Sequence, residues 1–284
     1  MTTHLHPNLS RPNKMNAGKP TATAIFAGLL LALAVGIGNA QAATPAEKGL
    51  EIAKEMDRRD LGFKDSRANL TMTLTNRHGE KSTRKLRLST LEVPDTATGD
   101  KSLTVFNYPR DIKGTAFLSF TKILDPDDQW LYLPAVKRVK RISSANKSGP
   151  FVGSEFAYED LVSFEVGKYS YKWLKDEACG DLTCFVIERT PKYENSGYTK
   201  QIVWVDQGEY RVQKVDFYDR KDSLLKTLVQ TQFKQYVDKY WRPSLMVVKN
   251  LQTGKATELR FSDYEFRVGL KEQDFTSSRL KRIR

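Results

Sequence analysis

Histidine is scarce in this chain of 284 residues, which contains only three. Two of them lie within the first six residues, and only His78 lies beyond residue 42. A zinc-binding H-E-x-x-H motif and a Ser-His-Asp triad both need histidines that the remaining chain does not have. A glycine-rich phosphate-binding loop is also absent from the sequence. We therefore expect a protein that is not an enzyme and that uses no metal and no cofactor.

Two stretches could still suggest catalysis. Residues 144–147 fit the pattern S-x-x-K, but the S-D-N and K-T-G partners of that motif are missing, which favours an ordinary loop. Glu155, Glu159 and Asp160 could form a carboxylate pair for acid–base work. The simpler interpretation is that these acids cap and solvate the start of a helix behind Ser154.

Cysteine is almost as rare as histidine. Cys179 and Cys184 are the only two, and they enclose the turn-like sequence GDLT. A C-x4-C pair without further ligands is a poor zinc site. In an exported chain, a local disulfide across a hairpin is the expected state of such a pair.

Long apolar runs are limited to one, the fourteen residues AIFAGLLLALAVGI at Ala24–Ile37. Lysines precede this run and the sequence Ala-Gln-Ala follows it, as in a secretory signal peptide. The run is short for a membrane-spanning helix, which needs about 20 apolar residues. We predict a signal peptide over residues 1–42 that is cleaved after Ala42, with a retained signal anchor as the alternative. The true start of translation could be Met15.

The remaining residues, 43–284, are expected to form a single domain. Pro45–Arg59 has the apolar spacing of a short helix, and from Ala68 onward the apolar residues alternate with polar ones. About eleven strand-like runs follow, separated by short turns, which favours an antiparallel sheet that curls on itself or splits in two. We expect helices at 153–164 and 169–178 to interrupt the strands and to cover the mouth of the curled sheet.

The net charge of +12 suggests an acidic partner. Basic residues are densest in the stretch YLPAVKRVKRI, which carries Lys137, Arg138, Lys140 and Arg141. For an exported protein, an anionic membrane surface is a more accessible polyanion than nucleic acid, and we predict no nucleic-acid partner. A solvated basic surface without a partner is the alternative.

Several strands are apolar on both faces, so each face needs a cover. For example, Trp130 and Tyr132 alternate with Leu131 and Leu133. Helices or a ligand could cover the second face, and so could the second sheet of an ordinary sandwich. The pattern alone leaves these possibilities open.

The order of several segments resembles the outer-membrane lipoprotein-sorting proteins of the LolA-like family. The similar segments are GTAFLSF, QWLYLPAVKRVKRI and FVGSEFAYEDL in the middle of the chain, then VWVDQGEYRVQKVDFYDRKDSLLKT, GKATELRFSDYEF and DFTSSRLKR. The resemblance implies a mainly β fold with a few helices, in which a strongly curved antiparallel sheet forms an incomplete β-barrel with a helical lid. It also implies a monomeric periplasmic carrier that binds the acyl chains of a lipid or lipoprotein and works with an inner-membrane exporter of the RND (MMPL-like) type. A sister group with the same fold, similar to the RseB/MucB regulators, implies the alternative of a sensor that binds lipid or an anti-sigma factor.

From this combined picture we predict which residues form the site. A one-residue slip in strand register would move a strand's whole apolar set to the opposite face. We expect Lys137, Arg138, Lys140 and Arg141 to meet anionic groups and three aromatic residues to fold over the mouth of the cavity. The predicted cavity residues are Leu70, Met72, Leu74, Leu86, Leu88, Phe117 and Trp130 on the strands, and Phe151, Phe156 and Tyr158 at the mouth.

Overall fold

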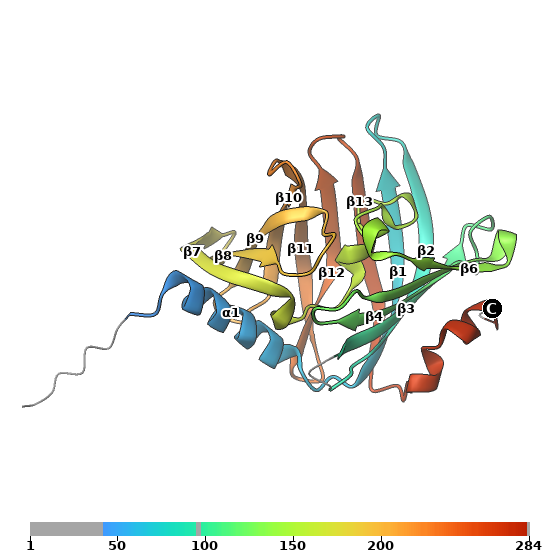
Figure 1. Ribbon diagram of the computed structural model, residues 1–284, viewed down its shortest axis with the longest axis horizontal. Coiled ribbons are helices and arrows are strands. Elements are labelled where there is room, and N and C mark those ends of the chain that lie inside the picture. The colour runs from blue at the N-terminus through green and yellow to red at the C-terminus, as the bar shows by residue number, and fades with distance from the viewer. Residues whose placement is uncertain (1–41, 95–97, 283–284) are drawn as a thin grey trace, which may run out of the picture. The chain divides into compact units, whose positions relative to one another are not determined.

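The computed structural model describes residues 42–94 and 98–282 (Figure 1). The predicted signal peptide and the alternative start Met15 therefore lie outside the described residues, except for Ala42. One α-helix, α1 (Pro45–Asp60), precedes thirteen strands. The strands are β1 (Asp65–Thr75), β2 (Lys81–Leu91), β3 (Thr98–Tyr108), β4 (Ala116–Lys122), β5 (Asp128–Leu133), β6 (Arg138–Ile142), β7 (Tyr169–Cys179), β8 (Leu182–Pro191), β9 (Tyr198–Asp206), β10 (Val212–Asp219), β11 (Leu224–Tyr236), β12 (Tyr240–Asn250) and β13 (Ala256–Phe266).

All thirteen strands belong to one antiparallel sheet with the order β6-β5-β4-β3-β2-β1-β13-β12-β11-β10-β9-β8-β7. The pairing of β1 with β13 joins the two ends of the strand series at the centre of the sheet. The edge strands β6 and β7 do not pair with each other, so the curved sheet stays open. This arrangement confirms the predicted incomplete barrel and excludes a sandwich of two sheets.

Helix α1 forms where the sequence predicts it. Thr44 and Glu47 make a capping box, in which Thr44 Oγ1 accepts a hydrogen bond from the Glu47 N–H at 3.2 Å. The helix packs against β7, where a side chain at Gly49 would lie 2.7 Å from the backbone nitrogen of Trp173. Only glycine allows this close approach, which places Ile52 and Ala53 in the core.

The two expected inner helices do not form. Residues 169–178 belong to β7, because Tyr169, Tyr171 and Trp173 alternate with more exposed residues and pair with β8. The chain between β6 and β7, residues 143–168, is called the central segment below. It contains only short 3-10 turns, at Ser144–Asn146, Phe151–Gly153, Tyr158–Leu161 and Val166–Lys168; the other 3-10 turns are Pro134–Val136, Glu272–Asp274 and Ser277–Arg282.

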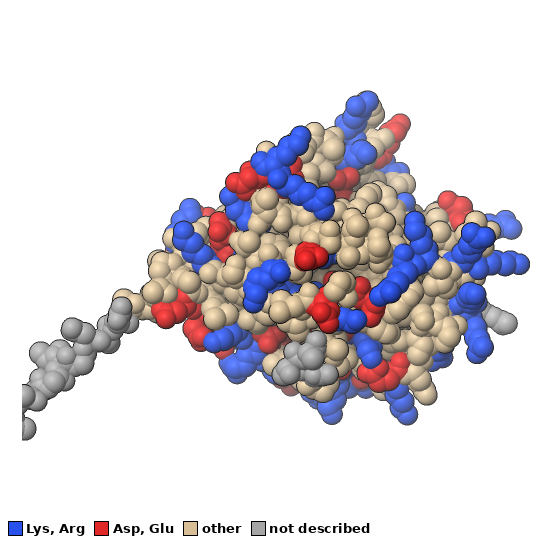
Figure 2. All heavy atoms as spheres, viewed as in Figure 1, with Lys and Arg blue, Asp and Glu red and all other residues tan. Residues whose placement is uncertain are grey.

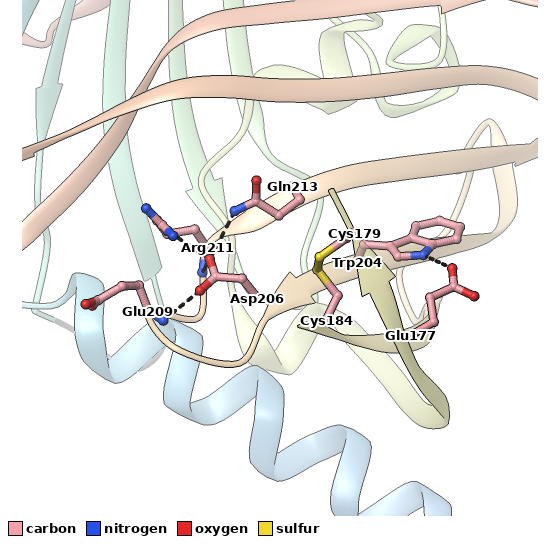
Figure 3. The surroundings of a disulfide bond; sticks show 8 residues. All are labelled: Glu177, Cys179, Cys184, Trp204, Asp206, Glu209, Arg211 and Gln213. Carbon is pink, nitrogen blue, oxygen red and sulfur yellow. Dashed lines mark hydrogen bonds and ion pairs between the residues drawn. A yellow bond between two sulfur atoms is a disulfide. The ribbon is translucent and has the colours of Figure 1, made fainter. Parts of the chain in front are cut away.

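A disulfide joins Cys179 and Cys184 across the turn between β7 and β8 (Figure 3), which confirms the predicted pairing. Near it, the buried Asp206 organises the turn between β9 and β10. Its carboxylate accepts hydrogen bonds from Arg211 Nε at 2.8 Å and from Gln213 Nε2 at 3.0 Å. Burial alone would raise the pKa of Asp206, but these hydrogen bonds outweigh it and lower the pKa.

The sheet buries apolar side chains on both faces. The larger cluster lies on the concave face and includes α1 and the central segment. A smaller cluster on the convex face forms where the C-terminal residues Leu270, Phe275 and Leu280 pack on β3, β4 and β5. The C-terminal segment therefore covers the second apolar face that the sequence left open. Among the described residues, no helix has the length and apolar character needed to cross a membrane.

Candidate functional site

The central segment covers part of the concave face with aromatic side chains. Phe151 packs between Phe106 and Phe117, with ring centroids 5.7 and 5.3 Å away. Tyr158 lies 5.4 Å from Phe117 and completes the cluster. This covered region, above β3 and β4, is filled by protein side chains.

A buried ion pair fixes the central segment to β11. Lys226 Nζ donates to Asp160 Oδ2 at 2.6 Å and to the Glu155 carbonyl at 2.8 Å. Both charged side chains are less than a tenth exposed, and Tyr198 Oη donates to the second Asp160 oxygen at 2.8 Å. Removing either partner would leave a buried charge uncompensated, so the pair holds the segment in one position.

The other two acids of this stretch also bind later parts of the chain, Glu159 in the loop before β9 and Glu155 on β12. Glu159 accepts hydrogen bonds from the Gly197 N–H at 2.7 Å and from Ser196 Oγ at 2.9 Å. Burial, together with the neighbouring Asp160 carboxylate, raises the pKa of Glu159. Glu155 accepts from Asn250 Nδ2 at 2.7 Å. The expectation that these acids are solvated around a helix start is therefore wrong, because they anchor the central segment to β9, β11 and β12.

Beside the covered region, the concave face is hollow. A cavity of about 1320 Å³ lies between α1, the end of the central segment and the C-terminal strands. Its size exceeds the roughly 300–1,000 Å³ typical of small-molecule sites. Its apolar wall comes mainly from β10, β11 and β12, and includes Val215, Phe217, Leu228, Met246 and Val248, with Met56, Phe156 and Phe164 on the other side.

Several carboxyl groups line the same cavity, among them Asp57 of α1, Asp100 of β3 and Glu165 of the central segment. Burial, followed by the Asp100 and Asp57 carboxylates, raises the pKa of Glu165 to about 7. Burial also raises the pKa of Asp100 to about 6. The Glu165 carboxylate lies directly against Gly99, where a larger residue would collide with it and with Thr121. In the described part of the chain, no three or more His, Cys, Asp or Glu residues are arranged to hold a metal ion.

A second cavity of about 480 Å³ lies at the β6 end of the sheet. Leu131, Leu133 and Ile142 form its apolar floor, and Tyr158 borders it. Lys140 is the one charged residue on its wall within the described chain. The central segment residues Ala145, Asn146, Ser148, Gly149 and Pro150 close the remaining sides.

Nine of the ten predicted cavity residues belong to, or pack against, the concave cluster. Only Leu88 and Phe156 line the larger cavity, and Tyr158 lines the smaller one. The structure places the other six, Leu70, Met72, Leu74, Leu86, Phe117 and Phe151, in the packed cluster and on the wall of neither cavity.

Trp130 lies elsewhere. It packs on the convex face, with its ring centroid 5.1 Å from that of Phe120, in the cluster under the C-terminal segment. Strand β5 places Leu131 on the concave face, so the prediction for this strand is shifted by one residue.

The four predicted basic residues are exposed, but they do not share one face. Arg138 pairs with Leu133 and Lys140 with Leu131, whose side chains are concave, whereas Arg141 pairs with the convex Trp130. Lys137 occupies the turn before β6 with φ of 48°. Figure 2 shows Lys and Arg side chains gathered at the end of the molecule where Figure 1 places β6.

The sequence analysis did not predict that β10 to β12 form the cavity wall. These strands carry the alternation that identifies one apolar face, as in Val215 and Phe217, which flank Asp216. The signal was present, but it does not show which strands the central segment leaves uncovered.

Comparison with known proteins identifies the family. A domain from Vibrio parahaemolyticus that is assigned to the outer membrane lipoprotein-sorting proteins is 58% identical, with a TM-score of 0.81, over 83% of this chain and 99% of that chain. The chain belongs to this family of outer membrane lipoprotein-sorting proteins. A family model described as "uncharacterized protein" also matches residues 98–282.

Two further solved structures are similar to this chain. A DUF1329 family protein from Desulfovibrio piger is 30% identical over 84% of this chain and 100% of that chain, with a TM-score of 0.79. A LolA superfamily protein from Nitrosomonas europaea, 23% identical over 83% of this chain and 99% of that chain with a TM-score of 0.64, shares the fold. No curated protein matches the sequence.

Proposed function

We propose that this protein is a periplasmic carrier that binds the acyl chains of a lipid or lipoprotein in the larger cavity and moves them between the inner and outer membranes without catalysis. The observation that carries the proposal is the hollow of about 1320 Å³ on the concave face, with an apolar wall built from three strands. Membership of a lipoprotein-sorting family supports the same cargo class. Delivery by an inner-membrane exporter of the RND type belongs to the proposal.

The cavity wall can bind acyl chains without a specific polar anchor. Each buried methylene group contributes about 0.8 kcal/mol, so about ten methylenes supply about 8 kcal/mol. That free energy corresponds to a dissociation constant of about 1 μM. Leu228, Met246 and Val248 present apolar surface to the cavity, as such binding requires.

A polar group of a cargo also has a place to bind. Arg189 lines the cavity, donates from Nε to Gln201 Oε1 at 2.6 Å and lies 4.8 Å from the ring of Tyr169. Its guanidinium is therefore held in place before cargo arrives. A guanidinium in this position suits an anionic head group or a polar ester linkage.

The proposal is tested by extracting lipid from purified protein and identifying it by mass spectrometry. We expect co-purifying acyl lipid with the native chain. Leu228→Trp should reduce the bound lipid about tenfold or more, since the indole occupies space in the cavity where acyl methylenes would bind.

Val229→Trp is the matched control. Val229 is the next residue on β11, points to the opposite face and is 40% exposed. Its substitution should leave the bound lipid unchanged. A lipid-free extract from the native chain, together with capture of an anti-sigma factor, would replace the carrier with a regulator.

A further inference from the structure

The two edges of the sheet differ in how they are protected. At β7, α1 lies against the backbone of Lys172 and Trp173. At the other edge, β6 pairs with β5 alone, and the described residues provide no other backbone hydrogen bond to Arg138–Ile142. An edge strand with unpaired N–H and C=O groups can accept another strand.

Charge at this edge favours an acidic partner. Lys137, Arg138 and Lys140 are exposed and form no ion pair with the described residues, whereas Arg141 pairs with Asp128. Because Arg138 and Lys140 lie on one face and Arg141 on the other, a flat anionic surface would contact only part of the set. A chain lying alongside β6 could place acidic side chains next to Arg138 and Lys140.

The smaller cavity adds an apolar contact on the same face. Leu131, Leu133 and Ile142 line it, and Lys140 stands on its wall. A strand that pairs with β6 directs alternate side chains to this face. On this face, an apolar side chain of such a strand would contact the cavity, and an acidic side chain two residues along would lie next to the cations.

We infer that β6 is a docking edge for an extended segment of a partner protein that presents acidic and apolar side chains on the same face, at positions two residues apart. The backbone ladder supplies affinity, while Lys140, Arg138 and the cavity of about 480 Å³ supply selectivity. The cations also discourage pairing between two copies of β6, which would bring like charges together. This surface is separate from the larger cavity and does not depend on the proposed cargo.

The experiment uses the chain without residues 1–42 and three probes. The first is a fluorescent octapeptide, called the alternating peptide, in which glutamate and valine alternate along one face of a strand and serines occupy the other face. The second, called the blocked peptide, has the same composition with the glutamates, valines and serines in separate blocks. The third is a phosphatidylglycerol vesicle. Binding is measured by fluorescence anisotropy or co-sedimentation, and hydrogen–deuterium exchange reports which strand is protected. We expect the alternating peptide to bind more tightly than the blocked one and to protect β6.

The double variant Arg138→Glu/Lys140→Glu should weaken binding of the alternating peptide by about tenfold or more. The control Lys85→Glu/Arg87→Glu makes the same charge change at the same spacing on β2, an interior strand paired on both sides. Its affinity should equal that of the native chain. Ala145→Trp, at the exposed border of the smaller cavity, should also weaken binding.

Three results would overturn the inference. They are equal affinity for the alternating and blocked peptides, protection of strands other than β6, and binding to vesicles without measurable peptide binding. The last result would assign the basic edge to a membrane surface.

Discussion

The covered and open regions of the concave face have similar apolar walls but different contents. Above β3 and β4, Phe151 of the central segment fills the space between Phe106 and Phe117. In front of β10 to β12, Leu228 and Val248 face a cavity of about 1320 Å³. The strands alone therefore do not determine where a cavity forms; the path of the segment that crosses them does.

The buried carboxyl groups of the concave face also differ from one another, in the charge of their neighbours. Asp160, which anchors the segment, has Lys226 at 2.6 Å, and Asp127 has Lys168 at 2.8 Å. At the cavity, Asp100 and Glu165 have other carboxylates among their neighbours, and their pKa values are raised. Asp160 and Asp127 therefore each have a lysine partner, whereas Asp100 and Glu165 form no ion pair with the described residues.

The largest effect is expected from breaking the anchor. Lys226→Met leaves the Asp160 carboxylate buried without its cation and should lower the free energy of unfolding by about 3–5 kcal/mol. Chemical denaturation measures this change. Lys200→Met, which breaks the exposed pair with Asp222, is the control and should cost less than about 1 kcal/mol.

A double variant separates charge burial from packing. Asp160→Asn combined with Lys226→Met removes the uncompensated charge and keeps one acceptor oxygen, which can serve the Ala157 N–H, while the Tyr198 hydroxyl can accept a hydrogen bond from the new amide. It should recover part of the lost stability. If the double variant is no more stable than Lys226→Met alone, the buried charge is not the cause.

The next effect compares the two regions directly. Phe151→Leu opens a void between two aromatic rings and should cost about 2 kcal/mol. Phe164→Leu, on the wall of the existing cavity, should cost less than about 1 kcal/mol, because its ring already borders empty space. Thermal and denaturant unfolding measure both, and equal costs would argue against the distinction between covered and open regions.

A smaller effect should appear in the pH dependence. The folded-state pKa of Glu165 is raised to about 7, above the usual 4.5, so folding favours its protonated form. Its contribution to stability is full below its unfolded pKa and is lost as the pH rises from about 4.5 to about 7. The native chain should therefore lose more stability over this range than Glu165→Gln, as measured by the unfolding midpoint at each pH. Parallel profiles for the two proteins would contradict the assignment.

The smallest effect is expected at Trp130. This residue packs against Phe120 on the convex face, away from the cavity. Trp130→Leu should leave the amount of bound lipid unchanged and reduce stability only modestly. Lipid analysis of the purified variant measures this. If bound lipid fell as predicted for Leu228→Trp, the placement of Trp130 outside the cavity would be wrong.

Local sequence patterns predicted much of the fold. The alternation through β1 and β2 predicted both strands, and the spacing in Pro45–Arg59 predicted α1. The predicted face of Trp130 was wrong, because β5 is apolar on both faces and the C-terminal segment covers the convex one. Local pattern cannot tell which of two apolar faces a distant segment will cover.

The conformation of the central segment depends even more on contacts with residues that are distant in the sequence. Its sequence FVGSEFAYEDL suggested a helix start, but Asp160 pairs with Lys226, which is 66 residues away. Glu155 likewise binds Asn250 of β12, and Glu159 binds Gly197 in the loop before β9. Because these long-range partners decide the conformation, the position of the cavity could not be predicted from the sequence.

The most direct measurement of the central claim is photo-cross-linking with a fatty acid that carries a diazirine on its acyl chain, followed by peptide mapping. The account predicts cross-links to β10, β11 and β12, around Phe217, Leu228 and Val248, and to α1 near Met56. Cross-links concentrated instead at Phe106 and Phe117 beneath the central segment, or at Trp130 on the convex face, would contradict it.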